Sequence, residues 1–154
     1  MAPLKVVTLQ PEWDGNTWRE IGKTEKGVVV VTSHLYEGIK SWPLDIELYQ
    51  KADSLPQGKA DPEFKKKPEI ALELINRTLE RGYRPGIVLS DVGYGNNTTF
   101  LQEVEKMKLK YIERIAKTRQ VKVKKGGKVT EENRIDILAK SLPKGAFTKN
   151  DLQL

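Results

Sequence analysis

The sequence contains no cysteine and a single histidine, His34. The lack of cysteine excludes disulfides, thiolate catalysis and cysteine-based zinc sites, and one histidine cannot form a metal site built on several histidines. His34 follows an apolar run, where we expect a structural or surface role. No apolar run approaches the ~20 residues that a membrane-spanning helix needs, and the N-terminus lacks a basic start followed by an apolar segment. We therefore expect a cytoplasmic protein without a membrane partner.

The positive charge is concentrated in one part of the chain. The 154 residues carry a net charge of +6, and 38% of them are hydrophobic, which is enough for one core. Residues 106–128 contain ten Lys/Arg and one acid. Such a segment is typical of a surface that binds DNA, in which case the protein would be associated with the nucleoid, and a solvated lysine-rich face is the alternative. The candidates for nucleic-acid contact are Lys106, Lys108, Arg114, Lys117, Arg119, Lys122, Lys124, Lys125 and Lys128.

Hydrophobic patterning predicts strands alternating with helices. Residues 1–18 are irregular, with Pro11 interrupting a short apolar run. A β-branched run and a segment with period two then predict an antiparallel hairpin, and a later continuous apolar run predicts a central strand. Helical spacing, with Pro68 in the first turn of one helix, predicts the elements between. The expected elements are strands 28–32, 42–49, 86–91 and 111–115, helices 68–81 and 98–108, a basic hairpin 121–129 and a helix 131–142. This order predicts an α/β fold, a mixed sheet with helices on its faces.

Asp91 is the residue with the most chemical meaning. It ends the apolar run, and the glycine-rich turn Gly93-Tyr94-Gly95 follows it. Functional groups of open α/β sheets gather at the carboxyl ends of strands, where the turn into the next helix exposes them. An aspartate that only caps a turn is the alternative. The turn is not a phosphate-binding loop of the P-loop type, because the required Lys and Ser/Thr are absent.

Several other residues have simpler interpretations. Asp45 and Glu47 share one face of a strand, which a solvated outer face explains. Tryptophans stack on nucleic-acid bases in some proteins. We expect Trp42 to be a core residue, while Trp13 and Trp18 fit either role.

A set of motifs spread over residues 19–142 resembles a known family. They are KPEIA at 67–71, LSDVGYGNN at 89–97 and RIDILAKSLP at 134–143. Together with the run GVVVVTSHLYEGIKSWPLDIELY, they resemble the catalytic core of DDE transposases from bacterial insertion sequences, most closely a group common in cyanobacteria. The combination is far more specific than any one of its motifs.

This resemblance implies a ribonuclease-H-like fold in which three acidic residues hold two Mg²⁺ or Mn²⁺ ions. Asp91 matches the second acid and is the implied catalytic and metal-binding residue. The first aspartate would fall at or before Met1, and Asp14 lies outside an apolar strand. The third acid lies beyond the segment that begins near residue 120, and Glu131 and Glu132 come too early. We therefore expect an incomplete fold that lacks the first catalytic strand and the C-terminal helix with the third acid.

The expected organisation has three parts: an irregular segment 1–18, a partial ribonuclease-H-like domain 19–116, and a basic hairpin and helix 117–154 that begin the family's insertion region. The implied function is DNA cleavage and strand transfer in transposition, with this chain catalytically incomplete and binding Mg²⁺ weakly on its own. One alternative is a non-catalytic DNA-binding remnant that uses Lys106–Lys128 or modulates a full-length transposase. Another is a fragment with no retained activity.

Overall fold

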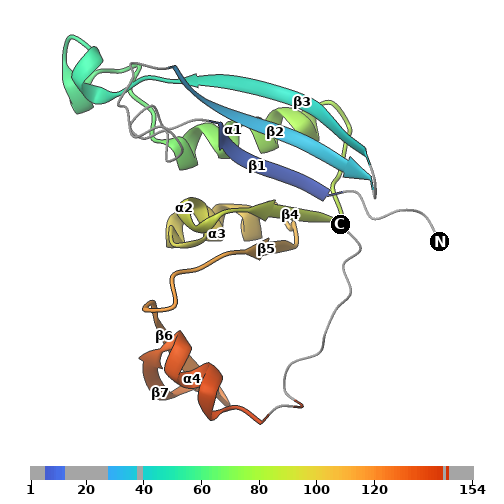
Figure 1. Ribbon diagram of the computed structural model, residues 1–154, viewed down its shortest axis with the longest axis vertical. Coiled ribbons are helices and arrows are strands. Elements are labelled where there is room, and N and C mark those ends of the chain that lie inside the picture. Colours follow the sequence, from blue (N-terminus) through green and yellow to red (C-terminus); the bar gives the residue numbers. More distant parts are fainter. Residues whose placement is uncertain (1–5, 13–27, 38–39, 144, 146–154) are drawn as a thin grey trace, which may run out of the picture.

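A five-stranded mixed sheet forms the centre of the protein, described here from a computed structural model (Figure 1). The structure describes residues 6–12, 28–37, 40–143 and 145. The strands of the main sheet are β1 (Val6–Glu12), β2 (Val29–Glu37), β3 (Lys40–Tyr49), β4 (Ile87–Ser90) and β5 (Tyr111–Glu113). The other elements are the 3-10 turns η1 (Ala52–Ser54) and η2 (Gly58–Ala60), helices α1 (Lys67–Glu80), α2 (Val92–Gly95), α3 (Thr98–Lys106) and α4 (Ile135–Ser141), and strands β6 (Gln120–Lys125) and β7 (Lys128–Arg134).

The strand order in the main sheet is β3-β2-β1-β4-β5. β2 pairs antiparallel with both β1 and β3, whereas β4 runs parallel to both β1 and β5. The predicted hairpin and the predicted strand over 86–91 therefore belong to one mixed sheet, and β4 lies inside it. The α/β class and the mixed sheet predicted from the sequence are confirmed.

The first strand differs from the sequence-based expectation. The sequence predicts an irregular segment over residues 1–18, yet Val6–Glu12 form β1 between β2 and β4. Pairing with β4 ends at Leu9, so Pro11 has a strand neighbour on one side only, where the missing amide of proline is tolerated. The strand position expected to be missing is thus filled. Asp14, Trp13 and Trp18 lie outside the described residues.

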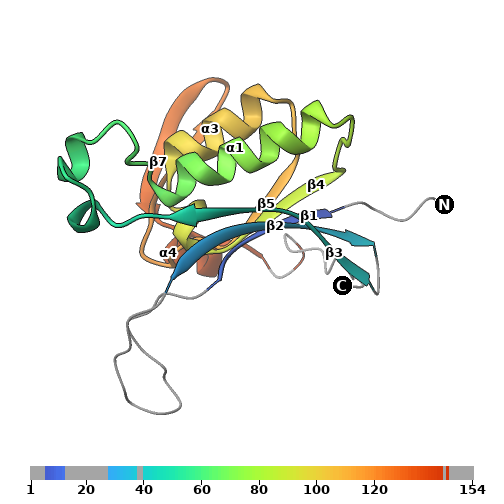
Figure 2. The same ribbon diagram turned by 90° about the horizontal axis from the view of Figure 1, so that it is seen from above.

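Helices α1 and α3 cover one face of the sheet (Figure 2). In α1, Pro68 lies in the first turn, as predicted, and five residues at helical spacing turn a buried face to the strands. After the helix, Gly82 adopts a φ of 83°, a left-handed conformation that glycine reaches without strain. The core cluster consists of Val31, Ile70, Ala71, Leu74, Ile75, Val88, Tyr94, Phe100, Val104 and Leu109.

Strand β3 turns its charged face toward α1, opposite to the sequence-based expectation. Trp42 is 51% exposed and Ile46 is 59% exposed, so the prediction of Trp42 as a core residue is wrong. Asp45 instead packs under the helix, with a side chain only 12% exposed. The cause is Arg77, which comes from α1 and contacts both Asp45 and Glu47. Period two holds from Asp45 to Tyr49, but the pairing with β2 shifts register at Leu44, which the pattern did not predict. Nor did the pattern reveal that arginines would pair with the polar face.

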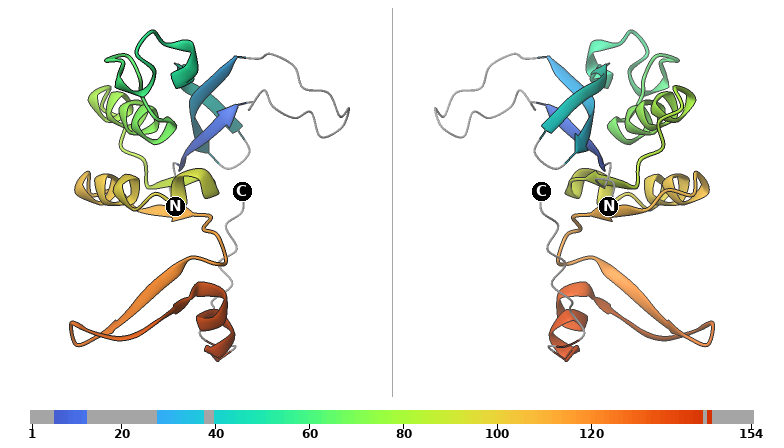
Figure 3. Two further views of the ribbon diagram at one scale, coloured as in Figure 1. Left: turned by 90° about the vertical axis from the view of Figure 1, so that its left-hand side faces the viewer. Right: turned by 90° about the vertical axis from the view of Figure 1, so that its right-hand side faces the viewer.

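Strands β6 and β7 form a separate two-stranded sheet that follows β5 in the chain and extends away from the main sheet (Figures 1 and 3). The predicted basic hairpin is confirmed. Its second strand runs on to Arg134, so the predicted helix over 131–142 is shortened to Ile135–Ser141. Among the described residues, no helix is long and apolar enough to cross a membrane.

Candidate functional site at the carboxyl edge of the sheet

Asp91 lies directly after β4 and caps the short helix α2. Its Oδ1 accepts a hydrogen bond from the Gly93 amide at 2.8 Å. The capping role that the sequence allowed is therefore present, and the second carboxylate oxygen is left for another partner. Because β4 and β5 are parallel, their carboxyl ends lie at the same edge of the sheet, which brings side chains from both strand ends together.

Glu113 is the second carboxylate at this edge. It is the register partner of Ser90, and the Ser90 hydroxyl donates a hydrogen bond to Glu113 Oε2. Glu113 Oε1 is buried without a hydrogen-bond partner among the described residues. The pKa of the Glu113 carboxyl is raised to about 7, mainly by burial and also by the charge of Asp91, while the bond from Ser90 opposes the shift.

Sequence reasoning missed Glu113 as a member of the site. A signal was available, because a strand over 111–115 is predicted next to one that ends at Asp91. Two parallel strands of similar length place their last residues side by side. The basic residues around Glu113 instead directed attention to charge, so that it counted only as the one acid in a basic segment.

β1 brings no carboxylate to the position beside Asp91. Leu9 pairs with Ser90, and the next residues along the two parallel strands are Gln10 and Asp91. Among the described residues, no group of three or more His, Cys, Asp or Glu side chains is placed to hold a metal ion. The oxygen atoms of Asp91 and Glu113 are of the type that a hard divalent cation prefers. This part of the structure therefore offers oxygen atoms that suit such an ion, but the described residues show no metal site.

The turn after Asp91 is held tightly against β5. A Cβ on Gly95 would lie 2.3 Å from the carbonyl oxygen of Arg114, so only glycine fits at this close approach. The Asn96 side chain accepts a hydrogen bond from the Ala116 amide at 3.0 Å. Tyr94 is buried, with its ring 5.5 Å from that of Phe100. These contacts fix the backbone that carries Asp91.

Comparison with known proteins identifies the family. Residues 5–134 match the family described as DDE superfamily endonuclease. The chain belongs to this family. It is also 31% identical over 104 residues to a protein of Microchaete diplosiphon described as "Probable transposase for insertion sequence element IS701". The matched region covers 67% of this chain and 27% of that protein, so this chain spans about a quarter of the relative's length. The resemblance to DDE transposases of cyanobacterial type is confirmed.

DDE superfamily endonucleases generally use divalent metal ions, which agrees with the oxygen ligands at the carboxyl edge. The matched residues include β1, β4 and β5 together with the turn that carries Asp91. The candidate site thus lies wholly within the region that defines the family.

The nine basic candidates for nucleic-acid contact in this DDE-family chain differ in their surroundings. Three of them have partners within the protein. Lys106 pairs with Glu103 at 2.6 Å, Lys122 pairs with Glu132 at 3.5 Å, and Arg119 donates to Gly95 O and to Thr98 Oγ1. Arg119 therefore joins the base of the hairpin to α2 and α3. The remaining candidates with exposed side chains are Lys108, Arg114, Lys117, Lys124 and Lys128. Lys125 falls outside the described side chains.

A pocket of about 300 Å³ opens beside Asp91. Its walls come from the end of β3, the start of α1 and the turn after β4. The lining residues include Tyr49, Lys66, Lys67, Asp91, Gly93 and Tyr94. No sequence motif pointed to this pocket, because its three walls are separated by long stretches of the chain.

Proposed function

We propose that this chain is part of the catalytic core of a DNA transposase, in which Asp91 is a metal ligand of the cleavage and strand-transfer centre. The observation that carries the proposal is the place of Asp91, at the carboxyl end of an interior strand within the family-matched region. The likeness to an insertion-sequence transposase supports DNA as the substrate. The whole protein would cut a phosphodiester bond and join the new 3′ end to a target.

We further propose that the fold is ribonuclease-H-like. The strand order β3-β2-β1-β4-β5, with only β2 reversed, supports this assignment, as does the cover of helices on one face. In such a sheet the central strand, β1, runs beside β4, and carboxylates near the carboxyl ends of both strands can approach one metal site. Gln10 occupies that place on β1, so the ligand expected from the first strand has no carboxylate counterpart there.

The residues of this chain would supply part of a metal site. Asp91 would offer Oδ2, because its Oδ1 accepts the hydrogen bond from the Gly93 amide, and Glu113 adds a carboxylate at the neighbouring strand end. A divalent ion bound there would polarise a DNA phosphate and lower the pKa of an attacking water or hydroxyl. A pair of ions needs more carboxylates than these two, so we expect the chain alone to bind an ion without cleaving DNA.

Binding of Mn²⁺ to the full chain tests this role of Asp91. The ion is paramagnetic and broadens NMR signals of nearby nuclei, so amide signals of residues 90–95 and 113 should broaden first on titration. The Asp91→Asn variant keeps the size of the side chain and removes its charge, and should lose this selective broadening. Asp53→Asn, an exposed aspartate in η1, is the matched control and should behave like the parent. Selective broadening elsewhere, or broadening that persists in Asp91→Asn, would contradict the proposal.

A nicking assay on supercoiled plasmid tests the second part. We expect no cleavage by this chain with Mg²⁺ or Mn²⁺. In the longer transposase relative, replacement of the aspartate that matches Asp91 by asparagine should abolish strand cleavage while the protein stays folded. Nicking by this chain that disappears in Asp91→Asn would mean that it holds a sufficient set of ligands, with Glu113 the first to test.

A second function has its own support. Exposed lysines on the β6–β7 hairpin, Lys124 and Lys128 among them, favour contact with a DNA backbone. In this alternative the chain binds DNA without catalysis, or modulates a full-length transposase. DNA binding without any metal effect at Asp91 would favour it.

A further inference from the structure

A cavity joins the candidate catalytic residue to two lysines from another part of the fold. Lys66 and Lys67 at the start of α1 line the same pocket of about 300 Å³ as Asp91. We propose that Lys66 and Lys67 bind a phosphate of the DNA backbone, next to the phosphate that reacts at Asp91. This inference rests on the proposed function and names the residues that would position the substrate.

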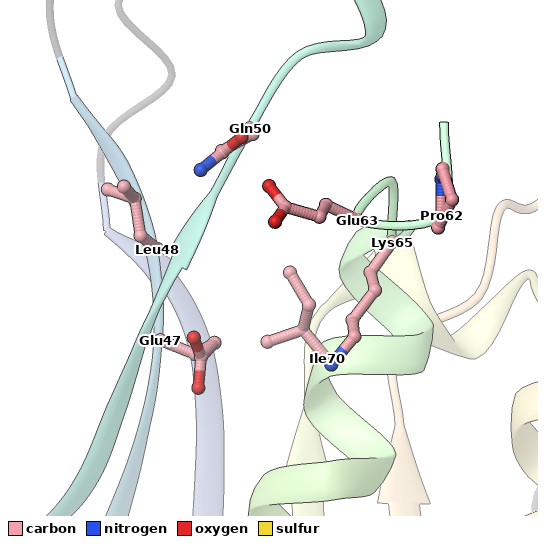
Figure 4. Close-up of a pocket in the computed structure, with 7 residues that line it drawn as sticks. All are labelled: Glu47, Leu48, Gln50, Pro62, Glu63, Lys65 and Ile70. Atoms are coloured by element: carbon pink, nitrogen blue, oxygen red, sulfur yellow. The ribbon is translucent and has the colours of Figure 1, made fainter. Parts of the chain in front are cut away.

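The three consecutive lysines 65–67 line two different cavities. Lys65 pairs with Glu73 at 2.8 Å and lines a separate cavity of about 470 Å³ between β3 and α1 (Figure 4). Lys66 is the N-cap of α1, and Lys67 is the first residue of the helix. Pro68 fixes the backbone at this point, because its φ angle suits the first helical turn. Two of the three lysines, those at the helix start, therefore line the pocket beside Asp91.

The ammonium groups of Lys66 and Lys67 both have positive charge that a ligand can pair with. Lys66 Nζ lies 3.9 Å from Glu69 Oε1, and the two side chains are 67% and 53% exposed, so this pair is weak. Lys67 Nζ lies 5.2 Å from the centroid of the Tyr49 ring. A cation over an aromatic face retains its full charge and its N–H donors. The contact with Tyr49 places Lys67 at the pocket without neutralising it.

The backbone at the helix start contributes little to this site. Glu69 Oε2 accepts a hydrogen bond from the Lys66 amide at 2.8 Å, and the Glu69 carboxylate lies in the first turn. It thereby satisfies the positive end of the helix. Pro68 has no amide hydrogen to donate. The anion would therefore be held by the lysine side chains.

Tyr94, another residue that lines the pocket, has a hydroxyl donor that lacks an acceptor among the described residues. Tyr94 is 2% exposed and lines the pocket, and its hydroxyl is buried without a partner among the described residues. Burial, with the charge of Asp91, raises the pKa of this hydroxyl, so it stays protonated at neutral pH. A buried hydroxyl is normally paired, and one that is not favours a ligand acceptor nearby.

The chemistry of the pocket favours a DNA backbone. Among the residues that line it, Lys66 and Lys67 carry two positive charges and Asp91 carries one negative charge, so the excess positive charge favours an anion such as a phosphate. Lysine acts on phosphate as a point charge that tolerates many orientations, which suits a strand that moves during reaction.

Fluorescence anisotropy of a labelled 20-base-pair duplex tests the assignment with the full chain. In EDTA-containing buffer, the variant Lys66→Gln/Lys67→Gln should bind about tenfold more weakly than the parent, and its slope of log affinity against log salt should fall by about two. The control is Lys40→Gln/Lys59→Gln, which removes the same charge. Lys40 also contacts an aromatic ring, Trp42, at 5.8 Å, so the control matches the loss of a cation–π contact as well. It should change affinity less than twofold.

Coupling to Asp91 separates a local effect from total charge. Asp91→Asn should tighten binding by about two- to fivefold in EDTA, because it removes a carboxylate beside the phosphate. That gain should vanish when Lys66 and Lys67 are glutamine, since the affected groups share one pocket. The exposed control Asp53→Asn should show no such coupling. Lys67→Arg keeps the positive charge and should bind the duplex like the parent. The Lys66→Gln/Lys67→Gln variant should melt at the same temperature as the parent, so that its loss of binding reflects the lost charge and not a loss of folding.

The outcomes distinguish this inference from the proposed function. Equal weakening by the two double variants, or additive effects of Asp91→Asn and the lysine changes, would overturn the lysine assignment while leaving the metal role of Asp91 intact. If the parent chain binds no duplex at all, the assignment falls as well. Absence of selective Mn²⁺ broadening at residues 90–95 in the parent chain, with the lysine coupling as expected, would instead contradict the metal role alone.

Discussion

Ser90 and Glu113 are register partners on the parallel strands β4 and β5, and the Ser90 hydroxyl donates a hydrogen bond to Glu113 Oε2. This bond satisfies one oxygen of a half-buried carboxyl and leaves the other without a partner among the described residues. The edge that carries Asp91 therefore contains a second acid whose charge is costly to the fold.

The stability of the protein should depend on pH through Glu113. Its carboxyl has an ordinary pKa of 4.5 and one of about 7 in the folded chain, so the folded state holds this proton more tightly than the unfolded state. The contribution to stability is complete below about pH 4.5 and is lost as the pH rises through about 7. Glu113→Gln should reduce the fall in the free energy of unfolding between pH 5 and pH 8. Urea denaturation at both pH values measures it.

Glu80→Gln serves as the control for this test, because Glu80 is an exposed glutamate at the end of α1. It should leave the pH dependence as in the parent. An unchanged pH dependence in Glu113→Gln would show that this carboxyl is ionised in the folded protein throughout the range.

Gly95→Ala should destabilise the protein by about 2–3 kcal/mol. The new Cβ would lie 2.3 Å from Arg114 O and 3.0 Å from Glu113 Cβ, so the turn must move away from β5. Chemical denaturation measures the loss, and Val92→Ala, at a residue 44% exposed in the same turn, should change stability by less than half as much. Equal effects of the two variants would show that the turn tolerates displacement.

The ion-pair network between α1 and β3 gives a third expectation. Arg77 contacts Glu47 and lies 3.4 Å from Asp45 and 3.9 Å from Glu73. Arg77→Met should lower the free energy of unfolding by about 1–3 kcal/mol at pH 7, because it leaves these carboxylates close together with less positive charge. Urea denaturation at pH 7 measures this loss.

Arg114→Met removes an exposed arginine and should cost little at pH 7. If Arg77→Met is equally harmless at pH 7, the network is a surface arrangement without a role in stability.

DNA binding by the hairpin is a fourth expectation. Lys124→Gln/Lys128→Gln should weaken binding of any duplex about equally, and should reduce the salt dependence, because phosphate contacts release counterions without reading the sequence. Anisotropy titrations at ~50 and ~200 mM salt give the slope. Lys122 is paired with Glu132, so Lys122→Gln alone should have a smaller effect. Binding that does not weaken with salt would contradict an electrostatic interface.

Local patterns predicted the elements well where one physical signal dominated. The β-branched run at 28–32 and the apolar run at 86–91 are strands, and Pro68 with the spacing of Ala71, Leu74 and Thr78 predicted a helix buried on one face. Asp91 was proposed as a site residue from its place after an apolar strand and from the family resemblance, and this role stays a prediction. In each of these cases the residues that determine the structure are close together in the sequence.

Long-range pairing explains most of what the sequence did not reveal. Which side of β3 is exposed depends on Arg77 and Arg81, more than 25 residues away. These arginines pair with Asp45, so the charged side of the strand lies toward α1. β1 is a strand because β2 and β4 flank it, although Pro11 breaks its local pattern. Glu113 and the pocket lysines join Asp91 only through the folded sheet. Propensity read along one segment cannot supply such information.

The central position of β1 also governs the order in which the chain can fold. Leu9 pairs with Ser90, which a ribosome adds ~80 residues later, or roughly 4–16 s at ~5–20 residues per second. During that interval β1 can rest against the β2–β3 hairpin, but its other edge stays open until β4 emerges. Contacts this distant in sequence slow the closure of a sheet. The carboxyl edge, and with it the site around Asp91, is therefore among the last parts of the molecule to assemble.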